Sequence, residues 1–350
     1  MNKRATGGRH GFPGAEPVLE VHDLVVEFAT EDGPLRAVDS VSFAIGRGEI
    51  VGLVGESGAG KTLTAEAILG LIRRPPGRVS GEVRFRGQNL LSLEEPALAR
   101  IRGKDIAMIF QNPGASLNPV FRVGDQLVEA MALHLGERRG VLRLRAGEIL
   151  SRVGIPSAAA RARDYPHQFS GGMAQRVMIG MGVACTPALL IADEPTTALD
   201  VTIQAQVLSL IRRLARELGM AVLLVSHDLG IVSQMCHRVI VMYAGRVVEE
   251  ASIATVFHAP AHPYTRALIA CLPGQDERGR LGAIPGVMPG LTALPPGCRF
   301  HPRCGVAEAR CATEVPRLRA AGAGQIAACH LVGNDGSASR RAVDARAEPE

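Results

Sequence analysis

One glycine-rich stretch contains the residue types best suited to chemistry. It matches the phosphate-loop pattern G-x-x-x-x-G-K-[ST] at every fixed position and has the sequence Gly55-Glu56-Ser57-Gly58-Ala59-Gly60-Lys61-Thr62. Glycines let backbone N–H groups surround a polyphosphate without clashes from Cβ atoms. The catalytic ammonium of Lys61 can reach the β- and γ-phosphates of a nucleotide, and the Thr62 hydroxyl can bind Mg²⁺. The stretch therefore predicts a site for a nucleoside triphosphate and Mg²⁺.

The residues on either side of this loop indicate how it is held. Residues 50–54 are apolar and predict a buried strand, and residues 63–71 predict a helix. A helix that begins at the loop directs the positive end of its dipole toward the phosphates. This order of strand, loop and helix is the context that a phosphate site requires. A glycine-rich turn with an unrelated lysine is the weaker alternative.

Two carboxylates follow another apolar segment. Residues 189–194 predict a buried strand that ends with Asp193 and Glu194. Asp193 suits a Mg²⁺ contact through water. Glu194 is placed to act as general base on the water that attacks the γ-phosphate. A helix cap is the alternative for one acidic residue after a strand, but two acids downstream of a phosphate loop favour catalysis.

Two further polar residues follow predicted strands at their C-terminal ends, where ligands of open α/β sheets bind. Gln111 follows residues 106–110 and can contact Mg²⁺ or the attacking water. His227 follows residues 221–226 and can contact the γ-phosphate. A capping or core histidine is the alternative for His227. We expect His227 to act in catalysis together with Glu194.

A second anion site is predicted at a helix N-terminus. Ser170 is a suitable N-cap for the helix that follows it, and Gly171 and Gly172 leave backbone N–H groups accessible. Simple capping is the alternative, which the tripeptide alone favours. Phe28, at the end of a strand predicted over residues 18–28, can stack on an adenine ring or be an ordinary core aromatic.

The composition indicates a cytosolic globular protein. The chain has 350 residues, 47% of them hydrophobic, and no apolar run long enough to cross a bilayer. Residues 1–17 lack the apolar core of a secretory signal and, like residues 333–350, are expected to be disordered. The net charge of +5 is spread along the chain, and only three Tyr, nine Phe and no Trp are available to stack on bases. Nucleic acid is therefore not an expected partner.

These motifs, taken in chain order, resemble those of the nucleotide-binding subunits of ATP-binding cassette (ABC) transporters. The resemblance covers residues 18–258 and rests on the phosphate loop, Gln111, Ser170-Gly171-Gly172, Leu189 to Glu194, Ala198-Leu199-Asp200 and His227. It implies an α/β P-loop NTPase fold with a RecA-like core, an antiparallel β subdomain and a helical subdomain at about residues 115–184. It also implies hydrolysis of ATP with Mg²⁺.

In this family two cassettes close head to tail around two ATP molecules. By resemblance, residues 170–173 face the phosphate loop of the second cassette, and Asp200 lies at the seam between the two. Phe28 matches the aromatic that stacks on adenine, and Gln111 matches the loop that couples to the membrane subunits. The helical subdomain is implied to contact the transporter. The chain departs from the family pattern at three positions, namely Phe169, Met173 and Ala174.

A narrower resemblance concerns the residues after the cassette. Segments similar to the C-terminal region of dipeptide and oligopeptide importers lie at residues 262–268, 284–286, 294–298 and 302–304. They imply a C-terminal domain over residues 259–332 and a role in peptide import, with nickel chelates or glutathione as alternative cargoes. The implied partners are a related but distinct second ATPase subunit, two membrane permease subunits and an extracytoplasmic solute-binding protein. The implied location is the cytoplasmic face of the inner membrane, and a cytosolic ABC protein acting on nucleic acid is the less favoured alternative.

Seven cysteines occur in the chain, and four of them gather near its end, at Cys298, Cys304, Cys311 and Cys329. Four thiolates can hold a zinc ion or an iron–sulfur cluster, although the C-x₂-C spacing of many zinc sites is absent. Disulfides are not expected in a cytosolic protein. A metal would give order to a segment rich in proline and glycine. The resemblance to peptide importers favours a [4Fe–4S] cluster, with zinc or free thiols as alternatives.

Overall fold

Strands and helices alternate along most of the chain, as expected for an α/β protein. The structure, a computed structural model, describes residues 17–31, 33–111, 116–197, 199–272 and 282–332. Residues 1–16 and 333–350, most of the segments expected to be disordered, lie outside the described residues. Pro17, which we had placed in the first of these segments, is instead the first residue of strand β1.

The apolar segments around the phosphate loop form the centre of an eight-stranded sheet with the strand order β11-β12-β10-β9-β3-β8-β7-β6. Its strands are β3 (Ile50–Val54), β6 (Ile106–Ile109), β7 (Leu189–Asp193), β8 (Ala221–Ser226), β9 (Arg238–Tyr243), β10 (Arg246–Ser252), β11 (Arg319–Gly322) and β12 (Gln325–Ala327). Neighbouring strands from β9 to β6 run parallel. Every residue of β3, β7, β8 and β9 is buried, because both faces of this part of the sheet are covered.

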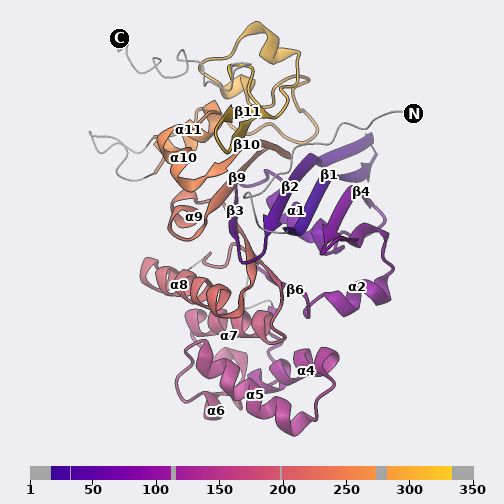
Figure 1. The fold of residues 1–350 in the computed structure, drawn as a ribbon, viewed down its shortest axis with the longest axis vertical. Helices are drawn as coiled ribbons and strands as arrows, with labels where there is room; N and C mark the ends of the chain where they lie inside the picture. The colour runs from indigo at the N-terminus through magenta and orange to yellow at the C-terminus, as the bar shows by residue number, and fades with distance from the viewer. Residues whose placement is uncertain (1–16, 32, 112–115, 198, 273–281, 333–350) are drawn as a thin grey trace.

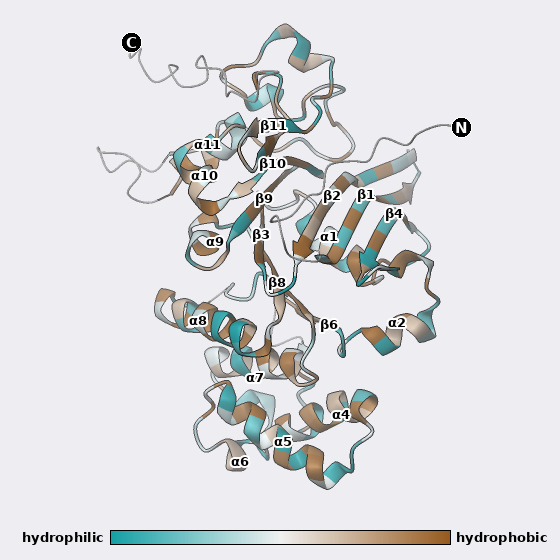
Figure 2. Ribbon diagram, viewed as in Figure 1, coloured by the Kyte–Doolittle hydropathy of each residue, from teal (hydrophilic) through white to brown (hydrophobic). Residues whose placement is uncertain are grey.

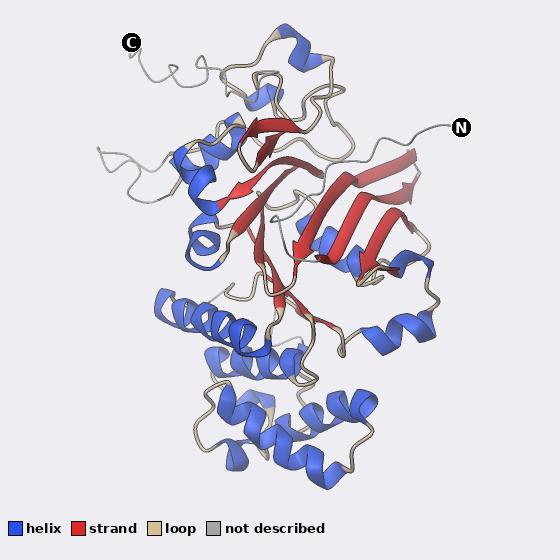
Figure 3. Ribbon diagram, viewed as in Figure 1, coloured by secondary structure: helices blue, strands red, loops and turns tan. Residues whose placement is uncertain are grey.

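A second, antiparallel sheet lies beside the first and has the order β2-β1-β4-β5 (Figures 1 and 3). Its strands are β1 (Pro17–Thr30), β2 (Gly33–Gly46), β4 (Gly77–Phe85) and β5 (Gln88–Asn89). Hydrophobic and hydrophilic residues alternate along these strands, as Figure 2 shows, because one face is buried and the other is exposed. Helix α1 (Lys61–Ile68) follows the phosphate loop, and its buried residues Ala65 and Ile68 share one core with Val21 of β1 and Leu53 of β3.

Several helices gather at one end of the molecule, opposite the C-terminal segment, a name that we use for residues 282–332 (Figure 1). The expected helical region contains α4 (Val123–Leu135), α5 (Arg139–Arg152), α6 (Ala158–Arg161) and α7 (Gly171–Val183). The other helices before it and after it are α2 (Glu95–Ile101), α8 (Val201–Leu218), α9 (Leu229–Met235), α10 (Ile253–His258) and α11 (Pro263–Ala270). Short 3₁₀ helices are η1 (Leu90–Ser92), η2 (Pro166–Gln168), η3 (His301–Arg303) and η4 (Ala309–Ala312). Within the described residues, no helix is both long enough and apolar enough to cross a membrane.

Two strands of the C-terminal segment join the main sheet. Strand β12 pairs with β10, and β11 pairs with β12, so both strands extend the main sheet. The Ala328 N–H continues this pairing by donating a hydrogen bond to the Val248 carbonyl at 2.8 Å. Without β12, strand β10 would be an edge with unpaired backbone groups. These two strands therefore complete the eight-stranded sheet.

Candidate functional site

The phosphate loop runs between the end of β3 and the start of α1 and depends on its glycines. Gly60 has a φ of +94°, and a Cβ atom there would lie 2.8 Å from the Ala37 carbonyl oxygen. A Cβ atom on Gly55 would lie only 2.2 Å from the Met242 carbonyl oxygen. Larger side chains would therefore push the loop away from the strands that support it. The structure thus has the strand–loop–helix arrangement that the sequence predicts.

Lys61 is buried at the centre of this loop. Its Nζ atom donates hydrogen bonds to the carbonyl oxygens of Gly55, at 2.7 Å, and of Glu56, at 2.9 Å. Burial lowers the pKa of the Lys61 ammonium, while the carboxylates of Glu194, Asp193 and Glu56 act in the opposite direction. An ammonium with little access to water interacts strongly with an incoming phosphate. The position therefore suits the phosphate contact that we predicted.

Thr62 and Asp193 meet although 131 residues separate them in the chain. The Thr62 hydroxyl donates a hydrogen bond to Asp193 Oδ1 at 3.3 Å. Burial raises the pKa of the Asp193 carboxyl, and the hydrogen bond from Thr62 opposes that shift. Mg²⁺ prefers oxygen ligands, commonly one or two protein groups together with water and phosphate. A hydroxyl and a carboxylate at the mouth of a phosphate loop fit that requirement.

The carboxylate of Glu194 is the point where several predicted site residues converge. It accepts hydrogen bonds from Gln111 Nε2 at 2.8 Å and from Thr197 Oγ1 at 2.9 Å. His227 Nδ1 lies 2.9 Å from its other oxygen. Burial opposes ionisation of Glu194, but the hydrogen bonds from His227 and Thr197 outweigh it, so the pKa of this carboxyl is lowered. Glu194 is therefore held as a carboxylate, the form that a general base needs.

Glu194 has an unusual backbone conformation. Its side chain also has a partner that the sequence did not predict. Glu194 has a φ of +45°, a conformation that is uncommon for residues other than glycine. Thr197, to which we gave no role, donates to this carboxylate. The only sequence signal was a hydroxyl residue three positions after the acid. Gln111, expected at Mg²⁺ or water, contacts Glu194.

Ser170 and Asp200 are both exposed helix caps. The Ser170 hydroxyl accepts from the Met173 N–H at 3.4 Å at the start of α7, and Asp200 accepts from the Ile203 N–H at 3.0 Å at the start of α8. The starts of α7 and α8 are in close contact. A Cβ atom on Gly172 of α7 would lie only 2.8 Å from the side chain of Ile203 in α8. The expected cap is thus confirmed for Ser170, and Ala198 of the neighbouring motif lies outside the described residues.

Phe28 is half-buried and packs against the apolar cluster beneath the antiparallel sheet. It pairs across the sheet with Leu35 of β2 and with Gly77 of β4. The ring is therefore part of the core on one side and accessible on the other. This position is compatible with a core aromatic and with an aromatic that stacks on adenine, so it does not distinguish the two predicted roles of Phe28.

The four C-terminal cysteines line one small cavity, together with Phe300 and other residues of the same segment. None of the four forms a disulfide bond within the described residues. Burial raises the pKa of the Cys329 thiol to about 11, and the three other thiols act in the same direction. The expectation of a metal here is not supported by ligand geometry. Among the described residues, no group of three or more His, Cys, Asp or Glu side chains is arranged to hold a metal ion.

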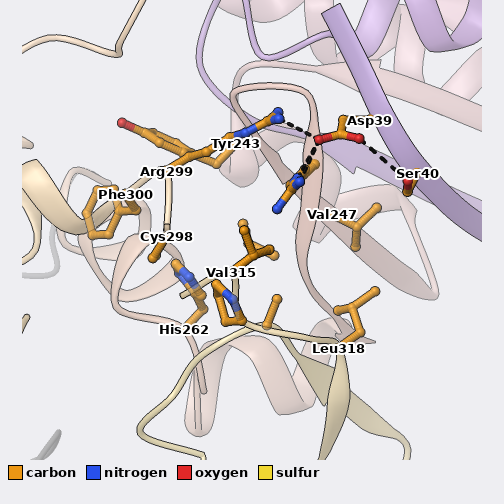
Figure 4. A pocket seen from close by; sticks show the side chains of 14 residues that line it. Asp39, Ser40, Tyr243, Val247, His262, Cys298, Arg299, Phe300, Val315 and Leu318 are labelled. Atoms are coloured by element: carbon orange, nitrogen blue, oxygen red, sulfur yellow. Dashed lines mark hydrogen bonds and ion pairs between the residues drawn. The ribbon is translucent and has the colours of Figure 1, made fainter. Parts of the chain in front are cut away.

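A larger cavity of about 280 Å³ lies next to the cysteines (Figure 4). Asp39 of β2 is at one end of it, and Cys298 and His262 are at the other. Arg246 and Arg299 both pair with the buried Asp39 carboxylate. The charges of Arg246 and Arg299 and their hydrogen bonds keep the pKa of Asp39 below its usual value even though burial acts to raise it. This ion cluster joins the C-terminal segment to the antiparallel sheet.

Comparisons with known proteins agree with this geometry. The chain matches the family model described as "ABC transporter" over residues 38–197 and the one described as "Oligopeptide/dipeptide transporter, C-terminal region" over residues 248–311. It is 49% identical to the dipeptide transport ATP-binding protein DppD of Escherichia coli over 316 residues, which are 89% of this chain and 96% of that protein. It is 46% identical to the oligopeptide transport ATP-binding protein OppD of Salmonella typhimurium, over 90% of this chain and 94% of that protein. The solved dimeric structure of MJ0796, a bacterial ABC transporter cassette, matches with a TM-score of 0.60 and 26% identity, over 67% of this chain and 98% of that one.

Proposed function

The chain belongs to the ABC transporter family, and on this premise we propose that it is the ATP-hydrolysing subunit of an importer for dipeptides or oligopeptides. The observation that carries the proposal is the extent of the match. It covers almost the whole length of a dipeptide transport ATP-binding protein, and the C-terminal region has its own match to peptide transporters. Nickel-chelate or glutathione import remains the alternative cargo assignment, and no observation favours it.

We assign the chemistry of ATP hydrolysis to the residues that meet at the phosphate loop. Lys61 and the loop amides bind the β- and γ-phosphates. Thr62 and Asp193, with Gln111 nearby at Glu194, hold Mg²⁺, which would neutralise charge on these phosphates. Glu194 accepts a proton from the attacking water, and this carboxylate is kept ionised by His227 and Thr197. His227, whose side chain is 58% exposed, is free on its outer side to contact the γ-phosphate.

A second cassette supplies the other half of the nucleotide site in this proposal. Ser170, Gly171 and Asp200 are exposed at the starts of two packed helices. Backbone N–H groups at the start of α7 point out of the helix and can bind an anion on another molecule. The second cassette is a related but distinct ATPase subunit. The two cassettes close around ATP and separate after hydrolysis.

The membrane partners are two permease subunits at the cytoplasmic face of the inner membrane, fed by an extracytoplasmic solute-binding protein. The helical region is the proposed contact with the permeases. Large apolar side chains are exposed there and just before it, including Phe110, Val120, Phe121, Leu133 and Leu144. Exposed apolar side chains that gather in one region are typical of interaction surfaces. Gln111, next to Phe110, links this region to Glu194.

The four cysteines are proposed to hold a [4Fe–4S] cluster. Support is confined to their position around one small cavity, because the side chains of the described residues form no group arranged to hold a metal ion. A cluster is larger than a single ion and is bound by thiolates spread around it. The test is metal and sulfide analysis of anaerobically purified protein, with Cys298→Ser as the variant. About four irons with matching sulfide, lost in the variant, support the cluster. One zinc ion per chain would indicate a structural zinc site in place of the cluster. If neither iron nor zinc is found, both the cluster and the zinc site are rejected.

Transport itself is tested by uptake of a radiolabelled dipeptide into cells that express the complete transporter. We expect uptake to require this chain and to be lost with Lys61→Ala, although the variant subunit is still produced. Unlabelled dipeptides and tripeptides should compete for uptake. Competition only by glutathione or by a nickel chelate would move the assignment to that cargo. Uptake that does not depend on the chain would refute the proposal.

A further inference from the structure

The phosphate loop is held from outside by the C-terminal segment. We use the name C-terminal arm for residues 282–304, which end with η3 between Cys298 and Cys304. Arg303 of this arm makes an ion pair with Glu56 of the phosphate loop, with Nη1 3.0 Å and 3.1 Å from the two carboxylate oxygens. These two residues are 247 positions apart in the chain. The Arg303 side chain is only 5% exposed, whereas that of Glu56 is 29% exposed.

Arg303 is itself fixed in place by several acceptors. Its Nε atom donates to the Pro285 carbonyl at 2.7 Å, and Nη2 donates to the Ile284 carbonyl at 3.4 Å. Its Nη1 atom also lies 3.3 Å from the Tyr243 hydroxyl at the end of β9. An arginine whose three guanidinium nitrogens all donate hydrogen bonds has little freedom, so it sets the position of the carboxylate that it binds.

Two further contacts bring C-terminal residues to the same loop. The backbone N–H of Glu56 donates to the Tyr264 hydroxyl of α11 at 2.9 Å. A Cβ atom on Gly58 would lie 2.9 Å from the terminal methyl group of Met288 in the arm. The second and fourth residues of the phosphate loop are therefore both contacted by residues that follow the cassette core.

The charge of Glu56 explains why such a contact matters for nucleotide binding. A carboxylate in a loop that binds polyphosphate repels its ligand unless a cation compensates it. Lys61, the cation of the loop, is hydrogen-bonded to the Glu56 backbone carbonyl rather than to its side chain. Arg303 is the cation paired with the Glu56 carboxylate. Its removal would leave a negative charge beside the phosphate site.

We infer that Arg303 is a positioning residue for nucleotide binding, which neutralises Glu56 and holds the phosphate loop in its binding conformation. The inference rests on the nucleotide role proposed for that loop. It gives the C-terminal arm a part in ATP binding by the cassette.

The test is calorimetric titration of the full chain with Mg-ADP, which is not hydrolysed. Arg303→Met is expected to weaken binding about tenfold, because it leaves the Glu56 carboxylate unpaired near the phosphates. Arg303→Lys keeps the charge but loses the forked geometry, and an intermediate loss of about threefold is expected. Glu56→Gln combined with either substitution should bind within about twofold of Glu56→Gln alone. This non-additivity distinguishes charge compensation from general loss of structure.

Arg310→Met is the matched control, because Arg310 lies in the same segment but pairs with Glu308 and the His330 carbonyl. Its Mg-ADP affinity should equal that of the unmodified chain. Equal losses from Arg303→Met with and without Glu56→Gln would overturn the inference, as would no loss at all. If Arg303→Met does not fold, the loss of Mg-ADP affinity caused by Arg303→Lys is compared with and without Glu56→Gln, and the same criterion applies. No Mg-ADP binding by the unmodified chain would instead refute the nucleotide role of the loop.

Discussion

The carboxylate of Glu194 shows how single residues are set up for their task. Its position after a buried strand is a local feature of the sequence. Its three hydrogen-bond partners are Gln111, Thr197 and His227, and two of them lie far from it in the chain. Two of these partners were predicted at the site because polar residues at strand ends face the ligand, His227 at the γ-phosphate and Gln111 at Mg²⁺ or the attacking water. Thr197 was missed, since a hydroxyl next to a carboxylate has no distinctive pattern.

Glu194→Gln is expected to separate binding from hydrolysis. The amide keeps the shape of the side chain but cannot take the proton of the attacking water. Turnover of ATP by the assembled transporter should fall at least about 100-fold, a typical loss for a general base. Affinity of the isolated chain for Mg-ATP should stay within about twofold, because the phosphates are bound by Lys61 and the loop.

Glu217→Gln is the control for this substitution, because Glu217 is an exposed residue near the end of α8 that pairs with Arg152 and Arg213. Its turnover should match that of the unmodified transporter. Turnover of Glu194→Gln at the unmodified rate would show that another group is the base.

Asp39→Asn is expected to reduce stability in a manner that depends on pH. The pKa of Asp39 is lowered in the folded protein, so its ion pairs stabilise the fold at every pH above the ordinary pKa of an aspartate. At neutral pH the substitution leaves Arg299 and Arg246 without their shared carboxylate. A loss of about 2–3 kcal/mol in the free energy of unfolding is expected there.

The direction of this pH dependence follows from the fact that the unfolded state binds the Asp39 proton more tightly than the folded state does. Because the unfolded chain takes up the Asp39 proton first as pH falls, the advantage of the carboxylate is fully present above the pKa of the unfolded chain and is lost as pH falls through the lower pKa of the folded protein. Urea unfolding of both proteins at about pH 7, 5 and 3.5 measures this difference. A difference that already narrows between about pH 7 and 5 would contradict the assignment.

At the scale of elements, the strands around the phosphate loop could be predicted and the C-terminal strands could not. β3 and β8 were expected at their observed bounds, because fully buried parallel strands are uninterrupted apolar runs. Helix α1 begins at Lys61 rather than at residue 63, because the left-handed Gly60 allows the first turn to start inside the loop. β11 has the sequence Arg-Ala-Ala-Gly, which has little strand preference, and it forms only because β12 already pairs with β10.

Glu249→Ala should loosen the attachment of these C-terminal elements. The fully buried Glu249 carboxylate of β10 accepts hydrogen bonds from the backbone N–H groups of Ala261 and His262, at 2.9 and 2.8 Å, and from Gln325 Nε2 at 2.7 Å. Removing it leaves buried donors unsatisfied and should cost about 3 kcal/mol of unfolding free energy. Hydrogen exchange should rise most in β12 and in the residues before α11.

Glu308→Ala removes an exposed carboxylate from the same segment and serves as the control, since its pair with Arg310 is at the surface. A change below about 0.5 kcal/mol is expected for it. Equal effects of the two substitutions would show that Glu249 has no special part in holding the segment.

At the scale of the whole molecule, the order of motifs along the chain predicted the cassette but not its contacts with the C-terminal segment. Arg303 and Glu56 lie 247 residues apart, and Arg299 and Asp39 lie 260 residues apart. Such pairs leave no periodic pattern, because each residue alone is an ordinary surface-type charge. The pairing of β12 with β10 was missed for the same reason, since these two strands come from distant parts of the chain.

Substitution of the apolar residues before α4 should affect transport without affecting the subunit itself. Val120 is 71% exposed and Phe121 is 53% exposed, so replacing both by serine removes little buried surface. The free energy of unfolding should change by less than about 0.5 kcal/mol. If the permeases bind here, dipeptide uptake should be lost and the subunit should no longer be recovered with the membrane fraction.

Val287→Ser is the matched control, because Val287 is 86% exposed and belongs to the C-terminal arm rather than to the helical region. It should leave uptake and membrane recovery unchanged. Mg-ADP affinity, measured on the isolated subunit, should be unaltered in both proteins, because neither surface reaches the phosphate loop through its side chain. Normal uptake by the Val120→Ser, Phe121→Ser variant would place the permease contact elsewhere. The remaining large apolar residues exposed on α4 and α5 are the next positions to test, namely Leu133, Val141 and Leu144.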